Sequence, residues 1–274
     1  MSEKTLVHLS DLHVGRGEGG DDVLERMCRQ LLRRKVDHVV VTGDITHRGR
    51  QGEWERFRAA FAGLEAEGRL SLVPGNHDRL NDEVATAMMP GGARVVVEPR
   101  PGLHLVGFDS TGPHNRSFRA SHGLLTRADV EQIVEAFDRA PPETLGVLLL
   151  HHHLLPLPRD NHAERLASWL GWASGGELEL GGELLLALRG RCDLVLHGHR
   201  HDPGTTSVFG EDDRPLSLFN AGSSTEIGHV RLFVHRHGRL VAPPRWLPAG
   251  LTVPAPFLEY VTASAVTGSD SHVS

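Results

Sequence analysis

Cysteine and long apolar runs are scarce in this sequence. The 274 residues include two cysteines, Cys28 and Cys192, and neither lies in a CxxC spacing. A disulfide framework or a cysteine-based metal site is therefore not expected. No apolar run approaches the roughly 20 residues that span a bilayer, and the first residues lack the positive region and apolar core of a signal peptide. We therefore expect a cytoplasmic protein with no membrane partner.

An excess of positive charge is also absent. The chain has 29 Lys and Arg against 35 Asp and Glu, for a formal net charge of -6. This balance argues against a general nucleic-acid-binding protein, which usually has a basic face. The length suits one α/β domain with a substantial core, which we place at residues 1–261, followed by a flexible tail of small and polar residues at 262–274. Assembly into a homo-oligomer is compatible with this composition.

The sequence instead contains five short apolar runs that each end in Asp, Asn or His. These segments are LVHLSDLH (6–13), HVVVTGD (38–44), LSLVPGNHD (70–78), GVLLLHHH (146–153) and CDLVLHGHRH (192–201). Short apolar runs bounded by turn residues are typical of buried strands. Because the carboxyl ends of neighbouring parallel strands meet at one edge of a sheet, we expect these polar residues to form a single cluster.

Each of these motifs alone has an ordinary structural explanation. GNHD could be a simple turn, since Gly, Asn and Asp favour turns. HGHRH could be a solvated loop, and HHH a short biased tract. Their joint occurrence at five successive strand ends favours a functional cluster.

Helical periodicity separates the first three strands. Residues 23–35 and 53–68 place apolar side chains on one helical face, and further helices are expected at 127–140 and 181–189. The strand-helix-strand order favours a parallel sheet with helices on both faces. A closing β-hairpin is expected near residues 237–238.

The histidines outside the strand ends are interpreted as structural. His8 and His38 lie within strand runs and are expected to be core or edge residues. His235, His237 and His272 are assigned to the surface or the tail.

The residues at the strand ends are suitable metal ligands. The candidates are Asp11, His13, Asp44, Asn76, one or more of His151, His152 and His153, His199 and His201. Carboxylate, amide and imidazole ligands without thiolate suit manganese, iron or zinc. The set is too large for one ion but suffices for two if a carboxylate bridges them. Two ions about 3.5–4 Å apart can activate water against a phosphate, so the sequence predicts a dinuclear phosphoesterase site.

These motifs, in this order, resemble those of the calcineurin-like metallophosphoesterases over residues 6 to about 225. The matching residues are Asp11-x-His13, Gly43-Asp44, Gly75-Asn76-His77-Asp78, His151 and Gly198-His199-Arg200-His201. The segments GDITHRG, VPGNHD and HGLLTRADVEQ are most similar to the bacterial branch of class III cyclic-nucleotide phosphodiesterases. The resemblance implies an α/β fold that is a four-layer α-β-β-α sandwich rather than a single doubly wound sheet. In that fold, the strands after Phe108 and the hairpin near residue 235 would belong to the second sheet.

The resemblance also implies a role for each motif residue. Asp11, His13 and His201 would hold the first metal; Asn76, His151 and His199 would hold the second; Asp44 would bridge both. A bridging hydroxide would attack phosphorus in line. His77 would stabilise the developing charge or protonate the leaving oxygen, oriented by Asp78.

Two features depart from the simplest family pattern. Three histidines follow the fourth strand, so His152 could be the ligand in place of His151. We prefer His151, because it comes directly after the apolar run. The additional His197, before Gly-His-Arg-His, is interpreted as a packing residue or a neighbour of the ligands.

Substrate contacts are predicted in the polar loop at residues 109–123. Arg forms bidentate contacts with phosphate oxygens, so Arg116 is the preferred contact, together with His114 and Asn115. The irregular segment 154–176 is interpreted as a lid or insertion beside the site.

The expected activity is hydrolysis of a small phosphodiester such as a 3′,5′-cyclic nucleotide. The alternatives are a nuclease or a nucleotide-sugar pyrophosphohydrolase of the same fold, and a binding scaffold without catalysis. The intact ligand set argues against the scaffold.

Overall fold

The structure of the protein, a computed structural model, describes residues 2–17, 20–117, 120–155 and 178–249. The tail predicted at 262–274, His272 and all but the first two residues of the segment 154–176 lie outside the described residues. Nothing in the structure therefore bears on the predicted lid or tail.

The first sheet is built around the N-terminal strand. Its order is β11 (Arg239–Leu240), β10 (His229–Arg236), β1 (Lys4–Leu9), β2 (His38–Thr42) and β3 (Leu70–Val73), with β12 (Arg245–Pro248) also paired to β10. Strands β1, β2 and β3 are parallel, because α1 (Gly20–Arg33) and α2 (Gln51–Ala66) return the chain to the same edge. β10 runs antiparallel to β1, so the sheet is mixed.

The second sheet begins with a hairpin and continues with parallel strands. Its order is β4 (Val95–Arg100), β5 (Leu103–Phe108), β6 (Leu145–Leu149), β7 (Leu194–His197), β9 (Leu216–Asn220) and β8 (Gly204–Val208). Strands β5, β6, β7 and β9 are parallel to one another. The edge strands β4 and β8 run antiparallel to their neighbours β5 and β9. α3 (Arg127–Asp138) lies between β5 and β6 in the chain, and α5 (Gly181–Leu188) comes before β7.

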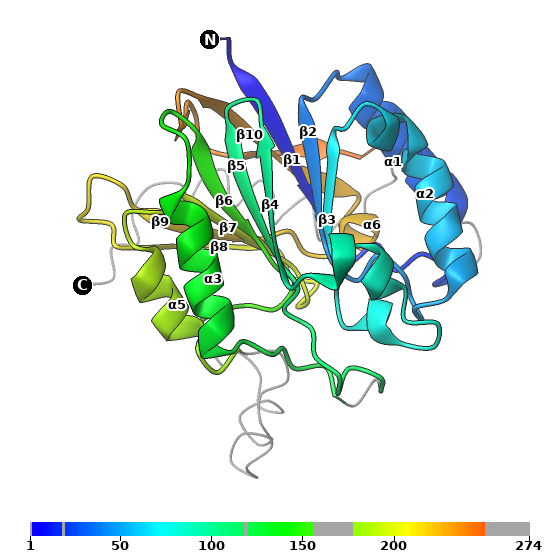
Figure 1. The fold of residues 1–274 in the computed structure, drawn as a ribbon. Coiled ribbons are helices and arrows are strands. Elements are labelled where there is room, and N and C mark those ends of the chain that lie inside the picture. The colour runs from blue at the N-terminus through cyan, green and yellow to red at the C-terminus, as the bar shows by residue number, and fades with distance from the viewer. Residues whose placement is uncertain (1, 18–19, 118–119, 156–177, 250–274) are drawn as a thin grey trace.

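Three apolar clusters hold four layers together. One packs α1 and α2 on the outer face of the first sheet, and another packs α3 and α5 on the outer face of the second. The third lies between the sheets, where Phe233 of β10 meets Phe219 of β9 edge-on at 5.0 Å. Both faces of each sheet are therefore buried, which explains the nearly continuous apolar strands. Figure 1 shows the resulting α-β-β-α order, and the implied four-layer sandwich is confirmed.

The division of strands between the two sheets differs from the expectation. The second sheet already begins at β4, before Phe108, and the hairpin near residue 235 belongs to the first sheet. Its strand β10 pairs with β1 from Lys4↔His235 to His8↔Arg231. The interpretation of His235 as a surface or tail residue is therefore wrong, since its side chain is 1% exposed. His8 and His38 are buried in strands as expected.

Short turns follow the strands at the edge where the polar motifs lie. They include the 3-10 turns η1 (His77–Arg79), η2 (Val84–Ala87) and η3 (Pro90–Gly92) and the single helical turn α6 (Ser224–Ile227). We call this side, where β1, β2, β3, β6 and β7 end, the carboxyl edge, and the opposite side the amino edge. Among the helices that the structure describes, none combines the length and apolar character needed to cross a membrane.

Candidate metal centre

The predicted ligands occupy strained turns at the carboxyl edge. Five of them have a left-handed backbone: Asp11, His13, Asp44, His199 and His201, with φ between 46° and 76°. Residues other than glycine rarely adopt this conformation, because the Cβ atom crowds the backbone. Such strain persists where the surrounding structure enforces it and is concentrated at functional sites.

Two glycines of the motifs allow the turns to approach one another. A Cβ on Gly75 would lie 2.2 Å from Oδ1 of Asp44, and one on Gly198 would lie 1.8 Å from Oγ of Ser10. Both are far below contact distance. Gly75 is thus required where two turns of the first sheet pack together, and Gly198 where a turn of the second sheet packs against one of the first.

Three side chains form a first candidate ligand set, Asp11, His13 and His201. Nε2 of His13 lies 3.0 Å from Nε2 of His201, and Nε2 of His201 lies 3.6 Å from Oδ1 of Asp11. The other ring nitrogen of His201 lies 3.4 Å from a carboxylate oxygen of Glu226, which leaves Nε2 directed at the set. Such a carboxylate partner commonly orients a metal-binding histidine.

Three further side chains form a second set beside Asp44. Nδ1 of His199 lies 3.0 Å from Oδ1 of Asn76 and 3.2 Å from Nε2 of His151. Nδ1 of His151 lies 2.8 Å from the carbonyl oxygen of Thr42, to which it donates. This bond leaves the lone pair of Nε2 directed at the set.

Asp44 connects the two sets. Its Oδ1 lies 3.4 Å from Nε2 of His151, and its Oδ2 lies 3.9 Å from Nε2 of His13. The side chain is almost completely buried. One carboxylate therefore presents one oxygen to each set.

The buried carboxylate requires positive charge beside it. Burial alone would raise the pKa of Asp44, but His151 holds it well below its usual range. Burial would likewise lower the pKa of His151, yet Asp44 raises it to about 9. Positive charge between these groups is thus strongly favoured, and a divalent cation bound by carboxylate, amide and imidazole atoms supplies it. The residues present fit divalent metal ions.

His151, not His152, lies within a candidate ligand group. Both ring nitrogens of His152 are used elsewhere: Nδ1 lies 2.8 Å from Oγ of Ser110, and Nε2 lies 2.9 Å from the carbonyl oxygen of Ser121. His197 is buried next to the cluster, and its Nδ1 lies 3.4 Å from the carbonyl oxygen of Gly198. This placement is that of the packing residue expected from the sequence.

His77 lies at the centre, but its orienting partner differs from the expectation. Its Nδ1 donates to the main-chain oxygen of His47 at 2.8 Å, and its Nε2 lies 3.9 Å from Oδ2 of Asp44. The carboxylate of Asp78 instead accepts hydrogen bonds from the main-chain nitrogens of Ile45, Thr46 and Gly75 and from the Thr46 hydroxyl. Asp78 therefore connects the turn after β2 to the turn after β3.

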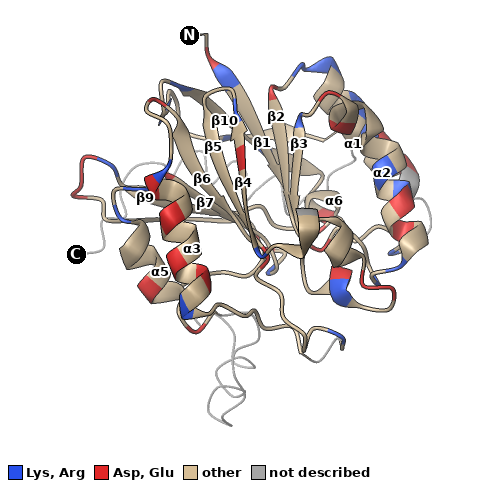
Figure 2. Cartoon of the chain, in the orientation of Figure 1, with Lys and Arg blue, Asp and Glu red and all other residues tan. Residues whose placement is uncertain are grey.

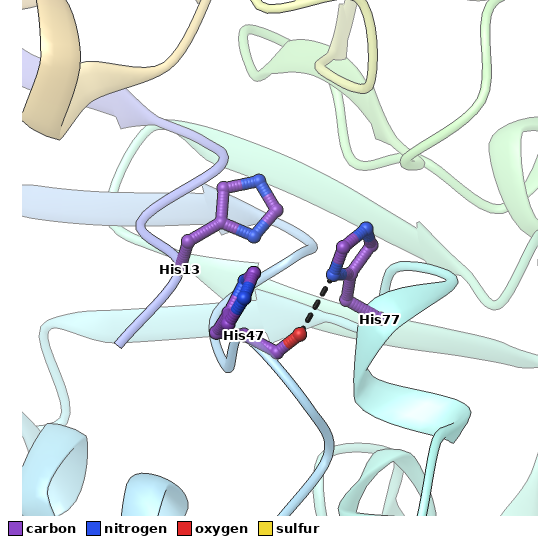
Figure 3. Close-up of side chains that lie close together, drawn as sticks. All are labelled: His13, His47 and His77. Carbon is purple, nitrogen blue, oxygen red and sulfur yellow. Dashed lines mark hydrogen bonds between the residues drawn. The ribbon is translucent and has the colours of Figure 1, made fainter. Parts of the chain in front are cut away.

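His47 lies in the quoted segment GDITHRG, but the sequence analysis gave it no role in the site. Figure 3 shows its ring beside those of His13 and His77, and these three residues offer nitrogen atoms within 4.8 Å of one another. Its position three residues after Asp44, in the same turn, was the available signal. The turn that follows a strand end with candidate ligands thus contributes a side chain of its own to the site.

The three predicted substrate residues lie together in the loop after β5. Arg116 is 71% exposed and pairs with Glu83 at 2.8 Å. Asn115 is buried, and its side chain bonds to the main chain of Gly112 and Ala120. The ring of His114 stacks on His122 at 4.0 Å. These contacts of Asn115 and His114 thus stabilise the loop itself.

Comparison with known proteins identifies the family. A model of the calcineurin-like phosphoesterases matches residues 4–203, and the chain belongs to this family. Membership in this family implies divalent metal ions, in agreement with the candidate ligand groups described above. The expected superfamily is confirmed.

Curated relatives and solved structures agree with this assignment. A probable cyclic nucleotide phosphodiesterase from Rhodopseudomonas palustris is 29% identical over 161 residues, which are 54% of this chain and 56% of that protein. The chain thus matches about half the length of this relative. A second protein of the same description, from Pseudoalteromonas, is 20% identical over 74% of this chain and 73% of its own length. A dimetal phosphatase from Danio rerio shares the fold with a TM-score of 0.59 and 13% identity, over 90% of this chain and 99% of that one.

Variants at the two neighbouring histidines test which of them binds metal. We expect His151→Ala to reduce bound manganese from about two ions per chain to about one, because it removes a nitrogen of the second set. His152→Gln should keep both ions, since its ring is bonded to Ser110 and Ser121. Metal analysis after dialysis measures both. Loss of metal in His152→Gln, with full metal in His151→Ala, would reverse the assignment.

Proposed function

We propose that this protein is a dinuclear metal-dependent phosphodiesterase that hydrolyses a small phosphodiester. The observation that carries the proposal is the placement of Asp44, whose two oxygens lie toward different ligand sets. A carboxylate in this position can bridge two ions about 3.5–4 Å apart, the arrangement that activates water against a phosphate.

The proposed ligands follow the two sets. Asp11, His13 and His201 would hold one ion; Asn76, His151 and His199 would hold the other; Asp44 would bind both. Ligands of this type without thiolate suit manganese, iron or zinc. Two such ions, when bound, lower the pKa of a coordinated water to about 7 and neutralise charge on the phosphate.

His77 is proposed to act on the leaving oxygen. Because its Nδ1 donates to the carbonyl oxygen of His47, Nε2 is the nitrogen proposed to exchange a proton with the substrate. Nε2 also lies on the Asp44 side of the ring, which is where the ligand sets meet. Asp78 is proposed to support catalysis indirectly, by fixing the turns that carry Asp44 and His77.

Cyclic nucleotides are the proposed substrate class. The names of the Rhodopseudomonas and Pseudoalteromonas relatives support this class. Arg116 is the proposed phosphate or substrate contact, and His114 and Asn115 are proposed to hold its loop in place. The nuclease and pyrophosphohydrolase alternatives differ in substrate, and the scaffold alternative differs in having no turnover. Cytoplasmic location and self-association stay predictions.

A comparison of substrates tests the reaction class. Manganese-loaded protein should hydrolyse an aryl phosphodiester and 3′,5′-cyclic AMP at comparable rates, and a chelator should abolish both activities. The matching aryl monoester should be a poor substrate. Preference for the monoester would contradict the phosphodiesterase assignment, preference for single-stranded DNA would favour the nuclease, and no turnover with two metals bound would favour the scaffold.

Two variants separate the chemical role from the binding role. His77→Ala should keep its metals and lose about 10²–10⁴-fold in kcat, the usual contribution of a general acid. Arg116→Ala should mainly raise KM, by about 10-fold or more, because a charged hydrogen bond to the phosphate is lost. Steady-state kinetics with metal analysis measures both. Unchanged kcat in the first variant, or unchanged KM in the second, would remove that residue from the proposed site.

A further inference from the structure

A small cavity lies at the amino edge, on the opposite side of the sheets from the metal centre. Its volume is about 150 Å³, and it is enclosed by the beginnings of β1, β2 and β3, the β4–β5 turn and β10. Both sheets thus contribute to its wall. From Lys4 at this edge to Asp11 at the other, an extended chain covers about 20 Å, so the cavity is separate from the metal centre.

Three cationic side chains line this amino-edge cavity. They are Lys4, Arg69 and Arg100. Figure 2 shows Lys and Arg colour at the beginnings of β1 and β3, near the N-terminus. A guanidinium group is permanently charged and presents its donors in a fixed plane. Three cations from separate segments therefore meet at this wall, which also includes the carboxylates of Asp37 and Glu67.

The carboxylates near the cavity pair with these same three cations. Asp37 accepts hydrogen bonds from Lys4 and from the main chain and hydroxyl of Thr5. Glu67 is exposed and pairs with a terminal nitrogen of Arg69, and Glu98 pairs with one of Arg100. Each arginine is thus bound through terminal nitrogens, which leaves its Nε for another acceptor.

Three buried nitrogens of the wall have no partner among the residues that the structure describes. They are Nε of Arg69, Nε of Arg100 and Nε2 of His235. An arginine Nε carries a hydrogen that can only be donated. Buried donors of this kind are normally satisfied by protein, water or a ligand. A single ligand with several oxygen atoms could accept a hydrogen bond from each of these three nitrogens.

Burial is the main cause of a lowered pKa at both histidines of the wall. Burial lowers the pKa of His38 to about 4, with further lowering by Arg100 and Arg69. Burial also lowers the pKa of His235. Both rings are therefore neutral near pH 7, and neither adds a charge to the wall of the cavity.

We propose that the amino-edge cavity binds a small tetrahedral oxyanion of the phosphate type, held by Arg69, Arg100 and His235. Its volume of about 150 Å³ is well above the roughly 10–15 Å³ that a single bound water requires, so the cavity has room for such an ion. Arginine favours phosphate oxygens, since its planar donors match their geometry. This inference does not depend on the proposed phosphodiesterase activity.

Equilibrium dialysis with radiolabelled inorganic phosphate tests the proposal. Phosphate can also bind at the metal centre, so the titration is made on metal-loaded protein and repeated after chelation. We expect one phosphate per chain to remain bound after chelation. The double variant Arg69→Gln/Arg100→Gln should weaken this binding at least about 10-fold, because two charged donors are lost, and it should leave phosphodiester turnover unchanged.

Arg236→Gln is the matched control, since Arg236 is an exposed cation on the same strand as His235 and does not line the cavity. It should bind phosphate as the wild type does. Ring signals of His38 and His235 in the NMR spectrum of the chelated wild type provide a second readout that needs no variant, and both should shift as phosphate is added. Absence of phosphate binding after chelation, unchanged binding in the double variant, or ring signals that do not respond would overturn the proposal.

Discussion

The carboxylate of Asp44 is the group on which the rest of the site depends. It is buried, it lies in a strained left-handed turn, and its two oxygens lie toward two different sets of ligands. A buried charge is tolerated only where it is compensated, by paired groups or by metal. The surrounding turns meet this requirement: Gly75 allows close approach, and Asp78 ties the two turns together. The strained backbone of Asp44, the close packing of the turns around it and the proposed metal binding thus all depend on this one buried carboxylate.

The ligand positions could be predicted from the sequence because strand geometry is simple. Short apolar runs that end in polar residues predict buried strands whose carboxyl ends converge. The structure brings Asp11, Asp44, Asn76, His151 and His199 together in this way, as the hydrogen-bond distances record. The choice between His151 and His152 needed coordinates, since it depends on Ser110 and the carbonyl of Ser121, which lie in another segment of the chain.

Other features depend on pairings between distant segments, and local patterns do not encode these. The alternation in β10 predicted a hairpin but not that its first strand would pair with β1, more than 220 residues away in the sequence. The same pairing buries His235, which looked like a surface residue beside a polar turn. The main-chain oxygen of His47 holds His77, and a main-chain contact of this kind leaves no signature in residue type. Metal identity and substrate depend on loops that vary within a shared fold.

Metal content in a variant of Asp44 tests the central claim most directly. Wild-type protein and Asp44→Ala are dialysed against manganese and analysed for bound metal, with Asp138→Asn, an exposed carboxylate far from the ligands, as the control. If Asp44 bridges the two sets, its removal lowers the bound metal from about two ions per chain to nearly none, while the control keeps both. Retention of two ions by Asp44→Ala would contradict the account.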